Sequence, residues 1–128
     1  MNFFNASLAQ EGEDIIVTTE SFAVKVPPDR RASLKDHVGK NVVFGLRPED
    51  IHDPNFAPPG IVAQNVETEV DLTELMGNEI FLFLKSGEEE YVARVDPRTS
   101  YKMGDKVTMA FNMNNMHIFD KETEQVVR

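Results

Sequence analysis

The side chains that most often carry catalysis or bind metal ions are few and scattered in this sequence. The three histidines are His37, His52 and His117. No two of them lie two or four positions apart, so neither a strand nor a helical turn would bring two imidazoles onto one zinc ion. A histidine acting as a general base also needs orienting partners, and the sequence displays none. We therefore expect structural or surface histidines and no metal site.

Carboxylates are grouped in two places. Glu67, Glu69 and Asp71 alternate along one extended segment, which places neighbouring members about 7 Å apart on one face. Such a row could offer oxygens to a hard cation, but a solvated strand face is the simpler interpretation. The run Glu88-Glu89-Glu90 follows a Ser-Gly turn, and we expect it to be a hydrated loop tip with no further role.

Motifs for covalent chemistry and nucleotide hydrolysis are absent from the sequence. The chain has no cysteine, which excludes disulfides, thiol nucleophiles and thiolate-bound zinc. It has no Gly-x-Ser-x-Gly elbow, no Gly-x-x-x-x-Gly-Lys-Ser/Thr phosphate loop and no Gly-x-Gly-x-x-Gly turn. We therefore expect no enzymatic activity and no cofactor.

The charge of the chain argues against nucleic acids and membranes as partners. Its 128 residues include 13 Lys and Arg against 22 Asp and Glu, a net charge of −9 that repels phosphate backbones and anionic lipids. Phe81, Phe83 and Tyr91 could stack on bases, but few cations stand near them, so core packing is favoured. No signal peptide is expected at the N-terminus, and the longest apolar run is far shorter than the roughly 20 residues of a membrane span.

The segment Gly45-Leu46-Arg47-Pro48-Glu49-Asp50 is the strongest local candidate for a functional contact. It places a permanently charged guanidinium, a rigid proline and two acids at the end of an apolar strand. Arg47 is suited to an ion pair across a sheet edge or an interface. A purely local pair with Glu49 or Asp50 is an equal alternative.

Alternating apolar residues, separated by turn residues, predict short β-strands along most of the chain. The expected strands are 15–19, 22–26, 41–46, 62–72, 79–85, 91–95, 107–113 and a closing hairpin of 117–119 with 125–127. Only 33–39 suggests a helical turn. In the strand 62–72, Leu72 shares the parity of Val66 and Val70, so we expect it on the core side.

The length of the chain suits a single domain, 1–128. The segment 53–60 contains three prolines and a glycine, and we interpret it as a surface connection between two β-rich halves, 1–52 and 61–128. Many short strands at turn spacing predict an all-β fold, a small barrel or sandwich.

Five short motifs, in the same order and spacing, resemble the C-terminal regulatory domain of maltose-type sugar-importer ABC ATPase subunits. They are Met1-Asn2-Phe3-Phe4, Gly45-Leu46-Arg47-Pro48-Glu49-Asp50, Glu74-Leu75-Met76-Gly77-Asn78-Glu79, Gly104-Asp105-Lys106-Val107 and His117-Ile118-Phe119-Asp120. Met76 stands where leucine is usual in that family, and Glu124 where glycine is common. The resemblance covers nearly the whole chain.

The resemblance implies an all-β fold of OB-like small barrels in tandem, of the MOP or TOBE type. It implies a regulatory and dimerisation domain that does no chemistry, excised from an ATPase core. The expected partners are that core, a second copy of the subunit and cytoplasmic regulator proteins, at the inner face of the cell membrane. The residues that the resemblance assigns to interfaces or regulation are Arg47, Pro48, Glu49, Asp50, Gly77, Glu79, His117 and Phe119.

An alternative of another class is a stand-alone OB-fold module that binds an oxyanion or an oligonucleotide. The charge of −9 disfavours an oligonucleotide, and it argues against an oxyanion unless a local nest of backbone N–H groups supplies a positive field. The resemblance assigns the choice of the transported sugar to other subunits.

Overall fold

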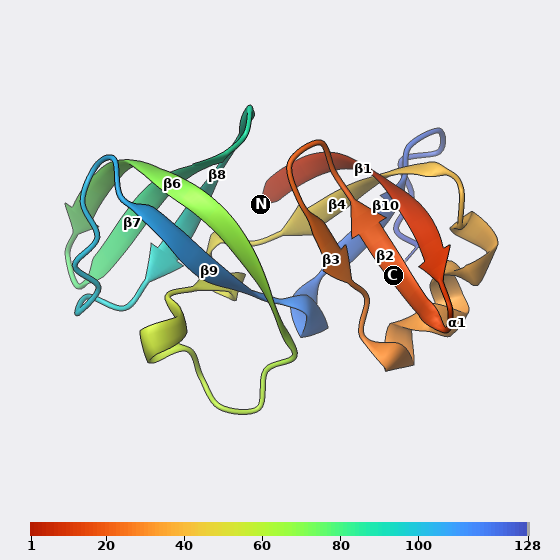
Figure 1. The fold of residues 1–128 in the computed structure, drawn as a ribbon, viewed down its shortest axis with the longest axis horizontal. Helices are drawn as coiled ribbons and strands as arrows, with labels where there is room; N and C mark the ends of the chain where they lie inside the picture. The colour runs from red at the N-terminus through yellow and green to blue at the C-terminus, as the bar shows by residue number, and fades with distance from the viewer. Residues whose placement is uncertain (128) are drawn as a thin grey trace.

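The computed structural model describes residues 1–127 and consists of two five-stranded antiparallel sheets lying next to each other (Figure 1). The first sheet has the strand order β10-β4-β1-β2-β3 and the second has the order β5-β9-β6-β7-β8. The strands of the first sheet are β1 Asn2–Glu11, β2 Asp14–Thr18, β3 Ala23–Lys25, β4 Asn41–Leu46 and β10 His117–Asp120. Those of the second are β5 Ile51–His52, β6 Ala63–Met76, β7 Glu79–Ser86, β8 Glu89–Val95 and β9 Lys106–Asn112.

Helical structure is limited to short turns, which confirms the expected all-β fold class. The turns are η1 Pro28–Arg30, α1 Arg31–Leu34, η2 Lys35–His37, η3 Pro48–Asp50, η4 Pro54–Phe56 and η5 Met113–Asn115. The helical turn expected at 33–39 coincides with the end of α1 and with η2. Within residues 1–127, no helix is long and apolar enough to cross a membrane.

The first strand, β1, lies at the centre of the first sheet and was not among the expected strands. It pairs with β2 on one side and with β4 on the other. Phe4, Ala6 and Leu8 alternate along it and are buried. This two-residue period is the ordinary signature of a half-buried strand.

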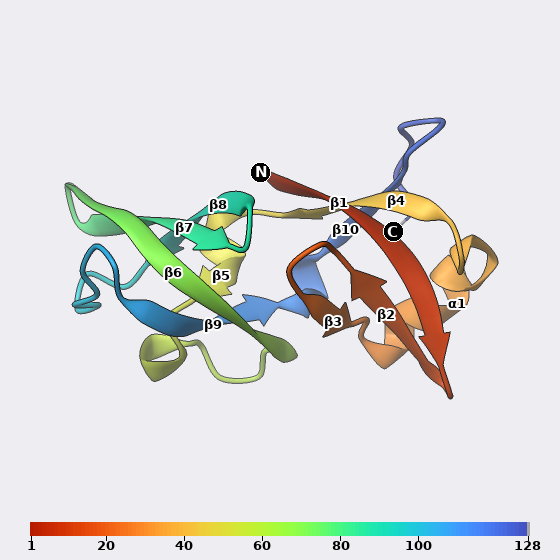
Figure 2. The same cartoon turned by 45° about the horizontal axis from the view of Figure 1, so that its top comes forward.

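Two strands are exchanged between the expected halves. β5, within 1–52, pairs with β9 of the second sheet, and β10, within 61–128, pairs with β4 of the first. Pro48 has no N–H to donate, so β4 ends at Leu46 and η3 carries the chain to the second sheet. The turn η5 carries it back, and both connections cross the middle of the molecule (Figure 2). The sheets are thus connected through η3 and η5, whereas 53–60 lies within the second sheet's own connections.

A β-bulge changes the facing of the long strand β6. The register with β7 shifts between Val70 and Leu72, which leaves one extra residue on β6. Val66 and Val70 stay on the core side, but Leu72 turns outward and is 42% exposed. The expectation that Leu72 faces the core is therefore wrong, because the bulge reverses the alternation beyond Val70.

An aromatic cluster joins the two sheets in one core. The ring of Phe4, on β1, lies 5.2 Å from that of Phe22, 5.7 Å from that of Phe44 and 5.3 Å from that of Tyr91 on β8. Phe111, on β9, lies 5.5 Å from Phe22 and 5.8 Å from Tyr91. Edge-to-face contacts of this kind add to the burial of apolar area, so the two sheets stabilise each other.

Polar contacts across the sheets reinforce this core at the edge of β8. The Asn2 amide donates to the Val92 carbonyl at 2.8 Å and accepts from the Val92 N–H at 2.9 Å. Glu89 accepts from the hydroxyls of Thr19 and Ser21, both at 2.6 Å. The interpretation of 88–90 as a hydrated tip without a role is therefore wrong for Glu89, which ties β8 to the turn between β2 and β3.

Candidate functional site: a polar cleft where the chain crosses between the sheets

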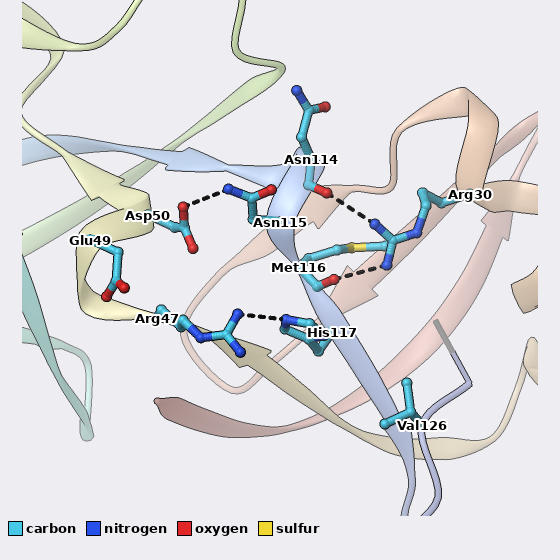
Figure 3. Close-up of a pocket in the computed structure, with 9 residues that line it drawn as sticks. All are labelled: Arg30, Arg47, Glu49, Asp50, Asn114, Asn115, Met116, His117 and Val126. Atoms are coloured by element: carbon cyan, nitrogen blue, oxygen red, sulfur yellow. Dashed lines mark hydrogen bonds between the residues drawn. The ribbon is translucent and has the colours of Figure 1, made fainter.

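A cleft with a volume of about 720 Å³ lies beside the two connections between the sheets. Four parts of the chain form its walls: the end of β4 with η3, the end of η1, η5 with the start of β10, and Val126 beyond β10 (Figure 3). The lining residues are Arg30, Arg47, Glu49, Asp50, Asn114, Asn115, Met116, His117 and Val126. Four of the residues expected at a functional site, Arg47, Glu49, Asp50 and His117, are therefore brought together here, with Pro48 as the first residue of η3.

Arg47 pairs across the cleft and not with its sequence neighbours. Its terminal nitrogen Nη1 lies 3.1 Å from Nε2 of His117, the first residue of β10. A guanidinium can only donate, so Nε2 accepts and the His117 ring carries its proton on Nδ1. Within residues 1–127 Arg47 makes no ion pair with Glu49 or Asp50. The alternative of a purely local ion pair is thus wrong.

The two acids of the cleft, Asp50 and Glu49, differ in burial. Asp50 is 7% exposed, and its Oδ1 accepts a hydrogen bond of 2.8 Å from the Asn115 amide. This bond connects η3 to η5 and holds the two crossings together. Glu49 is exposed, and among the described residues its carboxylate accepts no hydrogen bond.

The opposite wall is held by Arg30. Its guanidinium donates to the carbonyls of Asn114, at 3.1 Å, and Met116, at 2.8 Å (Figure 3). Partial burial lowers the pKa of His117, and the positive charges of Arg47 and Arg30 lower it further, while Asp50 opposes them. His117 is therefore kept neutral near pH 7, as its acceptor role toward Arg47 requires.

An aromatic patch, formed by the exposed Phe3 and the half-buried Phe119, adjoins the cleft on the outer face of the first sheet. Their rings lie 5.9 Å apart, edge to face, and His117 stacks on Phe119 at 6.3 Å. Gly45 lies beneath them, where an added Cβ would stand 3.1 Å from the Phe119 ring and 2.9 Å from the sulfur of Met1. Phe3 is 62% exposed. The glycine therefore lets both rings approach the backbone of β4, with Phe3 open to solvent and Phe119 partly covered.

The other two expected site residues lie elsewhere. Gly77 is in the turn between β6 and β7, with a φ of 65° that favours glycine. Glu79 follows on β7 and lies 3.8 Å from the Arg94 guanidinium on β8. Neither lines the cleft, so the structure divides the expected residues between two places.

The remaining candidates are spread over the molecule. His37 lies 3.5 Å from the Asp120 carboxylate, and His52 lies on β5, where burial lowers its pKa. Within residues 1–127, no three His, Asp or Glu side chains are grouped to hold a metal ion. Tyr91 packs in the core as expected, whereas Phe81 and Phe83 are half-buried on the opposite face of β7.

Sequence reasoning missed one buried carboxylate. Asp53 is 3% exposed although it begins the Pro-rich connection. Its Oδ2 accepts from the Thr99 hydroxyl at 2.9 Å, and its Oδ1 accepts from Tyr101 at 3.0 Å and from the Asn55 N–H at 3.0 Å. Asp53 thus joins η4 to the loop before β9. An Asp before a proline is a common cap, which was the available signal.

Comparison with known proteins identifies both parts of the chain. Residues 1–51 match a family model described as the MalK OB fold domain, and residues 44–119 match one described as the TOBE domain. The chain is 35% identical to the oligosaccharides import ATP-binding protein MsmX of Bacillus subtilis, and 36% identical to the multiple sugar-binding transport ATP-binding protein MsmK of Streptococcus mutans. Each alignment covers 100% of this chain and 34% of the relative. The chain therefore spans about a third of the length of these curated relatives.

The fold is also shared with a more distant solved structure. The cytoplasmic molybdate-binding protein ModG, solved with molybdate bound, superposes with a TM-score of 0.64 at 16% identity. The match covers 91% of this chain and 94% of that one. It shows the expected OB-like architecture, and at this identity it bears on the fold alone.

Proposed function

The chain belongs to the TOBE domain family, and on that premise we propose that it is the regulatory and dimerisation domain of a sugar-import ABC transporter subunit. The relatives that align over the whole chain are named as ATP-binding proteins of sugar import. This sequence contains no phosphate loop. In the proposed subunit the ATP chemistry therefore belongs to a separate core, at the inner face of the membrane, and this domain controls how two subunits meet.

The observation that carries the proposal is the aromatic patch of Phe3, which is exposed, and Phe119, which is half-buried. Exposed aromatic side chains are enriched in protein interfaces, where they bury a large area at a low cost in conformational entropy. Gly45 beneath the two rings leaves room for them against the sheet. An aromatic patch on a sheet face suits a two-fold contact, in which the same surface is used by both copies.

The distribution of charge also favours contact on this side of the molecule. Two copies together carry twice −9, or −18, which disfavours association over most of the surface. Beside the end of β10, however, Lys40 and Lys121 accompany Asp120 and Glu122 around one hollow. The local charge there is balanced, so two copies can approach with less repulsion.

Arg47 has a related role in the proposal. Its guanidinium is exposed at the rim of the cleft and is held by His117, without a carboxylate partner among the described residues. We expect it to contact an acidic group of the ATPase core or of the second subunit. An Arg47→Ala change in the full-length subunit should leave a folded domain but weaken coupling of ATP hydrolysis to transport.

Sedimentation equilibrium tests the dimer directly. We expect a monomer–dimer equilibrium in the micromolar range or weaker, which tightens as salt rises because screening reduces the repulsion of like charges. Phe119→Ser should abolish it, whereas Leu75→Ser, which removes an apolar side chain that is 72% exposed at the β6–β7 end, should not. Dissociation on adding salt would show that ion pairs hold the dimer, and an unchanged equilibrium in Phe119→Ser would refute the assigned surface.

A further inference from the structure

The cleft between the crossings has the size and lining of a small-molecule site. Its volume of about 720 Å³ lies within the range of pockets that enclose small ligands, and is far larger than a single inorganic ion needs. The walls are fixed by contacts already described, between Arg30 and two carbonyls, Arg47 and His117, and Asp50 and Asn115. The pocket is therefore formed before any ligand enters.

One side of the cleft offers a positive charge that residues 1–127 do not neutralise. Among residues 1–127, Arg47 donates only to the neutral ring of His117, which leaves its other N–H groups directed to solvent. In a protein of net charge −9, an arginine beside two acids would ordinarily pair with one of them. An anionic group of a ligand would supply the missing partner, because the planar guanidinium binds carboxylates and phosphates through two parallel hydrogen bonds.

The other side of the cleft offers hydrogen-bond acceptors. The Oδ2 atom of Asp50 and the whole carboxylate of Glu49 accept no hydrogen bond from the described residues. These oxygens would repel a bare oxyanion in the same pocket. They are, however, the acceptors that hydroxyl groups prefer, since an O–H bond to a carboxylate is short and strong. The amide of Asn115 adds a further polar group at the centre of the wall (Figure 3).

We propose that this cleft binds a polyhydroxylated anion, that is, a phosphorylated or carboxylated sugar or polyol. Arg47 binds the anionic group, and Glu49 and Asp50 accept hydrogen bonds from the hydroxyls. A neutral sugar lacks the partner of Arg47, and a bare phosphate lacks the groups that the two carboxylates need. Both should therefore bind more weakly than a ligand that combines the two features. The proposal goes beyond the dimerisation on Phe119 and does not depend on it, and the ligand's anionic group and the acidic group of a neighbouring subunit would be alternative partners of Arg47.

Titration of the isotope-labelled chain by NMR tests the proposal with four probes: glucose 6-phosphate, gluconate, glucose and inorganic phosphate. We expect glucose 6-phosphate or gluconate to bind with a dissociation constant of about 1 mM or below, and glucose and phosphate at least tenfold more weakly. The shifts should centre on Arg47, Asp50, Asn115 and His117. The two anionic probes decide whether a phosphate or a carboxylate is preferred.

Three variants make the test specific. Arg47→Ala should weaken binding of the preferred anion about tenfold or more while leaving the weak glucose titration unchanged. Glu49→Gln alters only an exposed side chain, so the fold is retained. It should weaken the binding of glucose 6-phosphate more than the binding of inorganic phosphate. Arg98→Ala removes an exposed arginine that lies over the Phe56 ring, away from the cleft. This control variant should leave the binding of glucose 6-phosphate and of inorganic phosphate unchanged.

Three results would overturn the inference. The first is inorganic phosphate binding as tightly as glucose 6-phosphate, which would indicate a simple anion site. The second is a set of shifts centred outside the cleft. The third is the absence of any saturable binding by both sugar anions. None of these outcomes contradicts the dimerisation proposal, because that proposal is tested separately, by sedimentation equilibrium of the parent chain and of Phe119→Ser.

Discussion

Removing the Asp53 carboxylate should destabilise the domain more than its place in a Pro-rich connection suggests. Asp53 is 3% exposed, and its two oxygens accept from Thr99, Tyr101 and both nitrogens of Asn55. Asn55 and Tyr101 are near enough to the surface to bind water in its absence. Thr99 is 6% exposed and would keep a buried hydroxyl without its partner.

The magnitude follows from these contacts. Hydrogen bonds to a charged acceptor contribute roughly 1.5–3 kcal/mol each, and a buried donor left unpaired costs roughly 1–3 kcal/mol. Because Asn55 and Tyr101 recover part of their loss from water, we expect Asp53→Ala to lower the free energy of unfolding by about 3–5 kcal/mol. For a chain of this size the melting temperature should fall by roughly 10–20 °C.

The Asp53→Asn variant removes the negative charge of the side chain but keeps its shape. Its amide oxygen can replace Oδ1 toward Asn55 and Tyr101, and its NH₂ group can donate to Thr99, whose hydroxyl reverses its role. We therefore expect a smaller loss, about 1–2 kcal/mol, measured by urea unfolding. If Asp53→Ala and Asp53→Asn were equally destabilising, the interpretation of these hydrogen bonds as the source of stability would fail.

A second measurement reports on the same carboxylate without relying on stability. Burial, the hydrogen bond to Asp53 and the negative charge of Asp53 together raise the pKa of Tyr101 to about 12, with burial as the largest cause. In Asp53→Asn the phenol pKa should fall but stay above its ordinary value, since burial is the larger cause. Absorbance titration of the phenolate in a Tyr91→Phe background isolates Tyr101. An unchanged pKa in a folded Asp53→Asn protein would refute the contact.

Two further predictions concern the C-terminal turn and the histidines. Glu124 is the non-glycine residue with a positive φ, 62°, among residues 1–127, so Glu124→Gly should raise the free energy of unfolding by roughly 0.5–1 kcal/mol, whereas Glu122→Gly should not raise it. Burial lowers the pKa of His52 and of His117 in the folded chain, so the unfolded chain takes up protons at a higher pH than the folded one. The stability that both provide is present above the unfolded pKa, about 6.5, and is lost as the pH falls through their lower folded pKa values. A His52→Gln/His117→Gln variant should therefore lose less stability between pH 7 and pH 5 than the parent chain, and an equal loss would contradict the assigned shifts.

The strands could largely be predicted from the sequence because their apolar residues alternate. The expected segment 41–46 coincides with β4, and the expected segment 79–85 differs from β7 by one residue at its end. The alternation in β1 was equally readable, in Phe4, Ala6 and Leu8, and was overlooked. β5 has two residues, too few to show any period. The bulge in β6 leaves the sequence pattern unchanged while reversing the facing of every later side chain.

The candidate site was less predictable because its contacts join distant segments. The sequence identified Arg47, but its partner His117 is 70 positions away, and only the exchange of β10 into the first sheet brings them together. Asp53 lies in a segment whose prolines indicate a surface loop, while its partners Thr99 and Tyr101 are 46 and 48 positions away. Local patterns report which residues lie on one face of a strand, and they carry no information on such pairs.

The exchange of β5 and β10 also explains why the cleft lies where it does. A chain that finished one sheet before starting the next would have a single connection between them, and a single connection leaves the sheets free to hinge. Here two connections cross the same region, and the bond from Asn115 to Asp50 fixes them to each other. Met113 and Met116, on either side of the polar residues of η5, are fully buried and anchor that crossing in the core. Polar side chains at the crossing are therefore held on a rigid base, and a site built on them needs no ordering of the backbone when a ligand or a partner binds.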